Sequence, residues 1–101
     1  MKLRLSPHAR ADLDEIWLYV ARESGAEDTA TRQVELIADK FALLCRFPYI
    51  GRPIPSERHP NVRTIVAQRY MIFYRPIPGE IRVLRVIHTS RDAFQVFDPA
   101  L

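Results

Sequence analysis

Two apolar stripes at helical spacing, separated by only a short break at residues 24–25, constrain the fold of this 101-residue chain more than any other feature. The first predicted helix runs over about residues 7–23, and Ser6 followed by Pro7 suits its N-cap and first position. The second runs over about residues 26–46, with apolar residues at intervals of 4, 3, 4 and 3: Ala30, Val34, Ile37, Phe41 and Leu44. Two amphipathic helices joined so closely must fold back on each other as a helical hairpin.

The second half of the chain changes to the β-branched and aromatic residues that favour strands. Residues 48–60 hold four of the eight prolines and predict a stiff connector without regular structure. Residues 62–67, 69–75 and 80–89 are expected to form three strands, and the short turn between the last two demands an antiparallel pair. A short edge strand is expected at residues 2–5.

The predicted order of elements is therefore β, α, α, β, β, β. This order favours an α+β fold in which the helical hairpin packs on one face of a mostly antiparallel four-stranded sheet and leaves the other face exposed. The length suits a single domain that covers residues 1–101.

Positive charge is concentrated in the second half of the chain. Residues 1–45 carry six basic and eight acidic side chains, whereas residues 46–101 carry nine basic and four acidic ones. All nine of these bases are arginines, whose planar guanidinium groups bind carboxylates and phosphates through two-point contacts. We therefore expect the arginine-bearing strands to line the exposed sheet face and to meet an anionic partner. A GC-rich genome also explains a bias toward arginine, although it does not explain the segregation into one half.

The residues present exclude several kinds of site. His8, His59, His88 and Cys45 are scattered without metal-ligand spacing, so no metal is expected. None of the three glycines lies in a glycine-rich phosphate loop, and no cofactor is expected. The lone Cys45 suits a reducing cytoplasm, and no apolar run approaches the roughly 20 residues of a membrane span. His88 is a candidate acid or base, with a purely structural histidine as the alternative.

Four segments together resemble the RelE/ParE superfamily of toxins, and the ParE branch most closely. They cover nearly the whole chain in order: residues 5–17 (LSPHARADLDEIW), 47–53 (FPYIGRP), 69–75 (RYMIFYR) and 83–92 (VLRVIHTSRD). The resemblance implies the same β, α, α, β, β, β fold. It also implies a small cytoplasmic toxin of a type II toxin–antitoxin system, held in a hetero-oligomeric complex by a ParD-like or similar antitoxin encoded beside it.

The superfamily divides by target, and this chain departs from one branch. RelE-like members of the superfamily cut messenger RNA on the ribosome. They usually have an arginine after the tyrosine of the third strand and a tyrosine in the C-terminal tail. This chain has Met71 after Tyr70, and Phe97 in the tail. Methionine cannot stabilise a pentavalent phosphate and phenylalanine cannot transfer a proton, so both departures disfavour RNA cleavage. The resemblance to ParE-like members implies inhibition of DNA gyrase by contact, without catalysis.

The preferred interpretation is a gyrase inhibitor with a cationic target-contact surface formed by Arg63, Arg69, Arg85, His88 and Arg91. The antitoxin is expected to lay an acidic, apolar segment over the helical hairpin and the sheet edge, on Leu13, Trp17, Val20 and Phe41. Two alternatives stay open. A ribosome-dependent endoribonuclease would use Arg69, Arg85, His88 and Arg91 for electrostatic stabilisation and proton transfer. An inactive toxin remnant would stabilise a plasmid or genomic locus only through its antitoxin complex.

Overall fold

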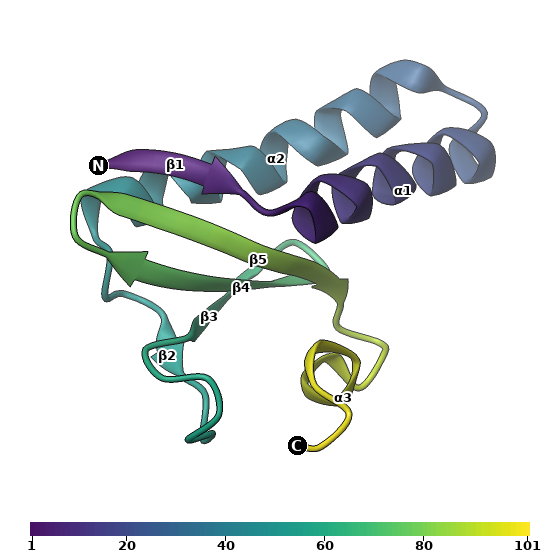
Figure 1. Ribbon diagram of the computed structural model, residues 1–101. Coiled ribbons are helices and arrows are strands. Elements are labelled where there is room, and N and C mark those ends of the chain that lie inside the picture. The colour runs from purple at the N-terminus through teal and green to yellow at the C-terminus, as the bar shows by residue number, and fades with distance from the viewer.

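The computed structural model describes residues 1–101 as three helices and five strands (Figure 1). In chain order these are β1 (Lys2–Leu5), α1 (Pro7–Ser24), α2 (Glu27–Arg46), β2 (Arg52–Pro53), β3 (Arg63–Ala67), β4 (Tyr70–Ile77), β5 (Glu80–His88) and α3 (Ala93–Phe97). The predicted α+β class and the helical hairpin are confirmed. No helix combines the length and the apolar character that crossing a membrane requires.

Local hydrogen bonds define both ends of α1. The hydroxyl of Ser6 accepts the N–H of Ala9 at 3.0 Å and donates to the carbonyl of Leu84 at 2.7 Å, which fixes the start of the helix against β5. At the other end, Gly25 adopts a left-handed backbone with φ 68° and donates its N–H to the carbonyl of Ala21. Glycine adopts this conformation without steric cost, so the chain can reverse at once into α2.

The strands form one sheet in the order β1-β5-β4-β3-β2. β1 runs parallel to β5, and the remaining neighbours are antiparallel. The prediction that residues 48–60 contain no regular structure is wrong for β2. In this additional strand, Arg52 and Pro53 pair with Thr64 and Arg63 of β3. Proline is compatible with this position because an edge strand leaves one side of its backbone outside the hydrogen-bond ladder.

The helical hairpin and one face of the sheet enclose the larger hydrophobic core (Figure 1). Its buried members are Ala9, Ile16, Ile37, Phe41, Leu44, Ala67, Tyr70, Ile72, Tyr74, Ile81, Val83 and Val86. The apolar stripes of both helices therefore meet the sheet, as their spacing predicts.

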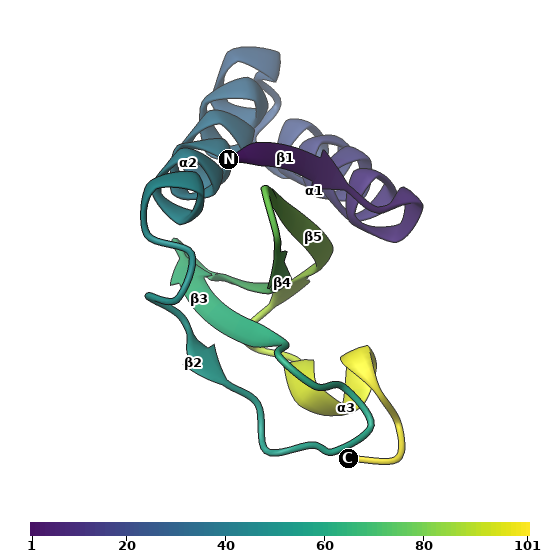
Figure 2. The same cartoon turned by 60° about the vertical axis from the view of Figure 1, so that its left-hand side comes forward.

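The opposite face of the sheet is covered in part, so the prediction that it is left exposed holds only for the remainder, where Val66 and Arg82 are exposed. A second apolar cluster forms there from Ile54, Val62, Phe73, Ile87 and Ala93. α3 and the segment between β2 and β3 lie on this side, away from the hairpin (Figure 2). Phe97 stacks on Phe73 with ring centroids 4.4 Å apart. This burial stabilises α3, because a helix of five residues does not persist alone in water.

A charged contact ties the C-terminal tail to the segment between β2 and β3. Oδ2 of Asp98 lies 2.7 Å from Nε2 of His59 and 3.6 Å from Nε of Arg58. Oδ1 of the same carboxylate accepts the N–H of Ala100 at 2.9 Å. The hydrogen bond from Ala100, with further contributions from His59 and Arg58, holds the pKa of Asp98 below its usual value against the opposing effect of burial.

This contact should make the free energy of unfolding depend on pH in the acidic range. Because the folded pKa of Asp98 is lowered, the carboxylate contributes fully above the ordinary aspartate value of about 3.9, and the contribution is lost as the pH falls through the folded pKa. We expect the wild-type chain to be more stable than Asp98→Asn at about pH 7, with a difference that shrinks between about pH 5 and pH 2. Thermal unfolding at several pH values measures it, with the exposed Asp39→Asn as control. A difference that is constant with pH would contradict the prediction.

Candidate functional site

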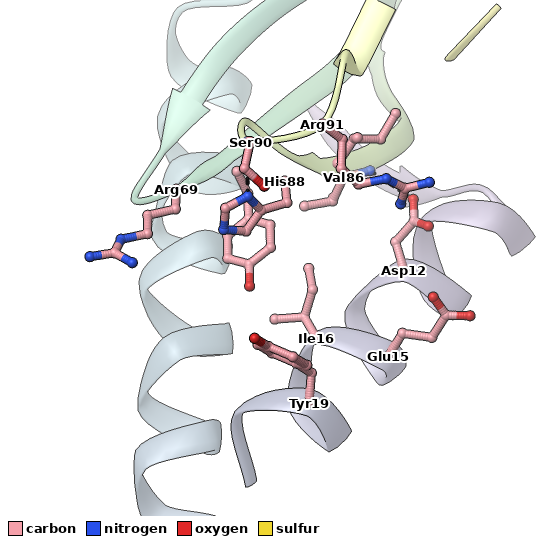
Figure 3. Close-up of a pocket in the computed structure, with 11 residues that line it drawn as sticks. Asp12, Glu15, Ile16, Tyr19, Arg69, Val86, His88, Ser90 and Arg91 are labelled. Carbon is pink, nitrogen blue, oxygen red and sulfur yellow. Dashed lines mark hydrogen bonds between the residues drawn. The ribbon is translucent and has the colours of Figure 1, made fainter. Parts of the chain in front are cut away.

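A pocket of about 470 Å³ opens between α1 and the adjoining ends of β4 and β5 (Figure 3). Three parts of the chain form its walls. They are α1 with Asp12, Glu15, Ile16 and Tyr19, the turn into β4 with Arg69 and Tyr70, and the end of β5 with the residues just beyond it, Val86, Ile87, His88, Ser90 and Arg91. The pocket therefore combines an apolar floor from the core with a charged and polar rim.

Three of the five residues predicted to contact a target line this pocket. Arg69 lies in the turn between β3 and β4, whereas His88 and Arg91 lie at and just beyond the end of β5. The carbonyl of Arg69 accepts the N–H of Thr89 at 2.8 Å, and this bond ties the turn to the end of β5. The fold thus brings together side chains that are far apart in the sequence.

The pocket lies on the helix side of the sheet. Its floor includes Ile16, Tyr70 and Val86, which belong to the core beneath the hairpin. The prediction that the arginine-bearing strands line an exposed sheet face is therefore wrong for Arg69 and Arg91.

The other two predicted contact residues are engaged inside the protein. Arg63 donates from Nη1 to the carbonyls of Gly51 and Tyr49 at 2.7 and 3.2 Å. Arg85 points toward α1 and pairs with Asp12. Their guanidinium groups hold the structure together, and a role of these two arginines in target contact stays a prediction.

The pair of Asp12 and Arg85 joins α1 to β5 at one wall of the pocket. Nε of Arg85 donates to Oδ2 of Asp12 at 2.8 Å, and Nη2 donates to Oδ1 at 3.0 Å. The N–H of Val86 donates to Oδ2 at 2.8 Å as well. The hydrogen bond with Asp12 raises the pKa of Arg85 against the opposing effect of burial, so the guanidinium stays charged. The carboxylate of Asp12 therefore pairs with the charged guanidinium of Arg85 and also accepts the backbone N–H of Val86.

His88 is oriented by a hydrogen bond and an aromatic contact. Its Nδ1 accepts the N–H of Ser90 at 2.9 Å, and its ring meets the ring of Tyr70 edge-on at a centroid distance of 5.1 Å. Acceptance at Nδ1 places the single proton of the neutral ring on Nε2. In this tautomer Nε2 donates a hydrogen bond and cannot take up a proton, so His88 suits the binding of an acceptor group better than general base catalysis.

The remaining polar groups of the pocket are also suited to binding. Burial raises the pKa of Tyr70, neighbouring Tyr19 raises it further and Arg69 lowers it, so the Tyr70 hydroxyl keeps its proton at neutral pH. Figure 3 shows Arg69 on one side of the pocket, with Asp12 and Glu15 on the other. The rim thus carries both signs of charge. No three metal-ligating side chains come together here or elsewhere.

The two departures from RNA-cleaving toxins lie away from the pocket. Met71 packs against the second apolar cluster, on the opposite side of the sheet. Phe97 stacks on Phe73 in the same cluster and meets His59 edge-on. Both side chains are therefore part of the packing that holds α3, and neither contributes chemistry to the pocket.

The residues predicted to bind an antitoxin belong largely to the core. Phe41 is only 3% exposed, so its side chain offers no surface, and it is corrected here to a core residue. Leu13 and Val20 pack against the same core and are partly buried. Trp17 donates its indole N–H to the hydroxyl of Thr31 at 3.1 Å, a contact within the hairpin.

Sequence reasoning missed the contribution of α1 to the pocket. Asp12, Glu15 and Tyr19 share one helix face because they are separated by three and four positions. That spacing was available in the sequence. The signal that was lacking is the position of this face beside the end of β5, which only the tertiary structure supplies.

Comparison with known proteins gives a consistent result. A family model described as the ParE toxin of the type II toxin–antitoxin system parDE matches residues 3–93. A relative named Toxin ParE1 from Caulobacter vibrioides is 33% identical over 90 residues, which cover 89% of this chain and 91% of the relative. Another Toxin ParE1, from Mycobacterium tuberculosis, is 34% identical over 91 residues, which cover 87% of this chain and 89% of the relative.

Solved structures share the fold. The chromosomal ParDE system from P. aeruginosa matches with a TM-score of 0.74 and 29% identity, over 87% of this chain and 95% of that one. The RelBE2 toxin–antitoxin complex from Mycobacterium tuberculosis matches with a TM-score of 0.60 and 23% identity, over 86% of this chain and 95% of that one.

Proposed function

Because this chain belongs to the ParE family of toxins from type II toxin–antitoxin systems, we propose that it inhibits DNA gyrase by direct contact and that a cognate antitoxin neutralises it. The observation that supports the first part is the arrangement of the pocket rim, where the exposed side chains of Arg69 and Arg91 lie beside His88, whose ring is oriented by the N–H of Ser90. Guanidinium groups exposed at a rim favour the binding of an anionic partner.

The proposed target contact is formed by Arg69 and Arg91, with His88 as a hydrogen-bond donor beside them. Both arginine side chains are exposed at the rim of the pocket. An exposed guanidinium can make two-point contacts with carboxylates of gyrase or with phosphates of the DNA that gyrase holds.

The proposed antitoxin is acidic in the segment that binds this chain. A net charge of +3 favours a partner of opposite sign, whose attraction raises the association rate at low salt. The two solved structures named above are described as toxin–antitoxin systems, which supports a hetero-oligomeric complex for this chain. In this proposal residues 1–101 act as one toxin domain, in the cytoplasm where gyrase works.

A supercoiling assay with purified gyrase tests the target. The chain should abolish supercoiling and cause cleaved DNA to accumulate. Arg69→Ala and Arg91→Ala should each weaken inhibition about tenfold, equivalent to about 1.4 kcal/mol of lost contact energy. Arg32→Ala is the matched control, since Arg32 is an exposed arginine of α2 outside the pocket.

Two results would replace the proposal. Cleavage of messenger RNA on purified ribosomes, without an effect on gyrase, would establish the endoribonuclease alternative. Normal growth of cells that express the chain without its antitoxin would establish the inactive remnant.

A further inference from the structure

Four consecutive residues between α2 and β2 form an exposed apolar surface, which we call the apolar loop (residues 47–50). Phe47, Tyr49 and Ile50 are 51%, 61% and 53% exposed, with Pro48 between them. Together with Arg46 they line a hollow of about 420 Å³ that shares no residue with the pocket beside α1. The other exposed large apolar side chains occur in ones and twos: Met1 with Leu3, Leu18 with Tyr19, and Val66 and Phe94 alone. Apolar side chains gathered in one place are typical of an interaction site, whereas single ones are not.

The backbone of the apolar loop is fixed from within the protein. Tyr74 of β4 is fully buried, and its hydroxyl accepts the N–H of Gly51 at 2.8 Å and donates to the carbonyl of Pro48 at 2.9 Å. Arg63 of β3 donates to the carbonyls of Tyr49 and Gly51. A surface held in one conformation loses little conformational entropy when a partner binds. The loop is therefore preorganised for docking.

The charge around the apolar loop is positive. The guanidinium of Arg46 lies 5.5 Å from the ring centroid of Phe47, and that of Arg63 lies 5.0 Å from the ring centroid of Tyr49. Residues 40–56 contain no acidic side chain. Carboxylates complement this surface, whereas a second copy of the chain would bring like charges together.

We propose that the apolar loop docks an acidic segment of the antitoxin that carries at least two large apolar side chains. The apolar groups fill the hollow beside Phe47 and Ile50, and the carboxylates reach the exposed guanidinium of Arg46. The inference rests on the proposed function in taking the antitoxin as the partner. It does not depend on gyrase as the target, because the loop and the pocket share no residue.

Titration calorimetry with the full-length antitoxin, the product of the adjacent gene, tests this proposal. The double variant Phe47→Ser/Ile50→Ser should bind the antitoxin about 100-fold more weakly than the wild-type chain. The matched control is Leu3→Ser/Val66→Ser, which removes side chains that are 42% and 50% exposed on β1 and β3. The control should keep the wild-type affinity, and both double variants should keep the wild-type thermal unfolding midpoint.

Two further measurements separate the electrostatic contribution to antitoxin binding, and any effect on gyrase inhibition, from the apolar docking contact. Arg46→Glu should slow association with the antitoxin about tenfold at low salt, with a smaller effect at high salt. The Phe47→Ser/Ile50→Ser variant should still inhibit gyrase as the wild-type chain does.

The outcomes distinguish this inference from the proposed function. Unchanged antitoxin affinity of Phe47→Ser/Ile50→Ser would overturn the docking site. Loss of gyrase inhibition with unchanged antitoxin affinity would assign the loop to the target instead. If the wild-type chain does not inhibit gyrase but the loop variant still loses antitoxin affinity, the docking site stands and the proposed target fails.

Discussion

Replacing Asp12 with alanine should lower the free energy of unfolding by about 3 kcal/mol, because the change removes the partner of a largely buried charge and of a backbone donor together. The Arg85 and Asp12 side chains are only 25% and 11% exposed. Without the carboxylate, the Arg85 guanidinium keeps its charge, and the N–H of Val86 has no acceptor. Urea unfolding followed by circular dichroism measures the loss.

Asp14→Ala is the matched control for this prediction, since Asp14 is an exposed carboxylate two residues along the same helix. It should change the free energy of unfolding by less than about 0.5 kcal/mol. The double variant Asp12→Ala/Arg85→Ala should lose less free energy of unfolding than the sum of the two single-variant losses, by about 1–2 kcal/mol. Equal losses for Asp12→Ala and Asp14→Ala would show that the pair contributes nothing to the fold.

The helical half of the chain could be predicted from the sequence because its signals are local. Ser6 and Pro7 mark the start of α1, Gly25 marks its end, and the apolar stripes lie on the buried faces. α3 has no such signal. Its five residues are too few to show a helical period, and the helix is held by the packing of Phe97 on Phe73, a contact between distant parts of the chain.

A β-bulge explains why the sequence did not show on which face of the sheet His88 lies. Tyr74 pairs with Val83 and Phe73 pairs with Arg85, so Leu84 is an extra residue in β5. Strict alternation from Val83 would place His88 on the face opposite the hairpin. The extra residue reverses the alternation and turns His88 toward the pocket beside α1.

The pairing of Asp12 with Arg85 was equally beyond sequence reasoning. The two residues are 73 positions apart, and nothing local in either segment indicates the other. The arginine count correctly showed a cationic half, but it could not show which guanidinium groups the protein's own structure uses. Arg85 and Arg63 are used in this way, whereas Arg69 and Arg91 remain exposed.

Gly51→Ala should destabilise the fold by about 3 kcal/mol, because a methyl group at this position has no space. A Cβ atom there would lie 2.5 Å from Oη of Tyr74 and 2.8 Å from the carbonyl oxygen of Thr64. The first atom belongs to a fully buried side chain and the second to the backbone of β3, so neither can move freely. Gly79→Ala is the control: nothing lies within 4 Å of its Cβ, and only its positive φ of 76° adds a cost, of about 1 kcal/mol.

Tyr74→Phe should destabilise the fold by about 2 kcal/mol, because it leaves the N–H of Gly51 and the carbonyl of Pro48 without their buried partner. Burial raises the pKa of Tyr74, with smaller opposing effects from Gly51 and Arg63, so the hydroxyl is protonated at neutral pH and able to donate. Tyr49→Phe, at an exposed tyrosine of the same loop, should have no effect on unfolding.

The combined variant Gly51→Ala/Tyr74→Phe tests whether the contact between Gly51 and the Tyr74 hydroxyl underlies the stability losses of both single variants. Removing the hydroxyl relieves the closest clash of the new methyl group, so the double variant should be about 1 kcal/mol more stable than additive losses predict. Urea unfolding of the four proteins gives this coupling energy directly. Strict additivity would mean that the hydroxyl of Tyr74 does not fix Gly51, and the rigid backbone proposed for the apolar loop would then lose its main support.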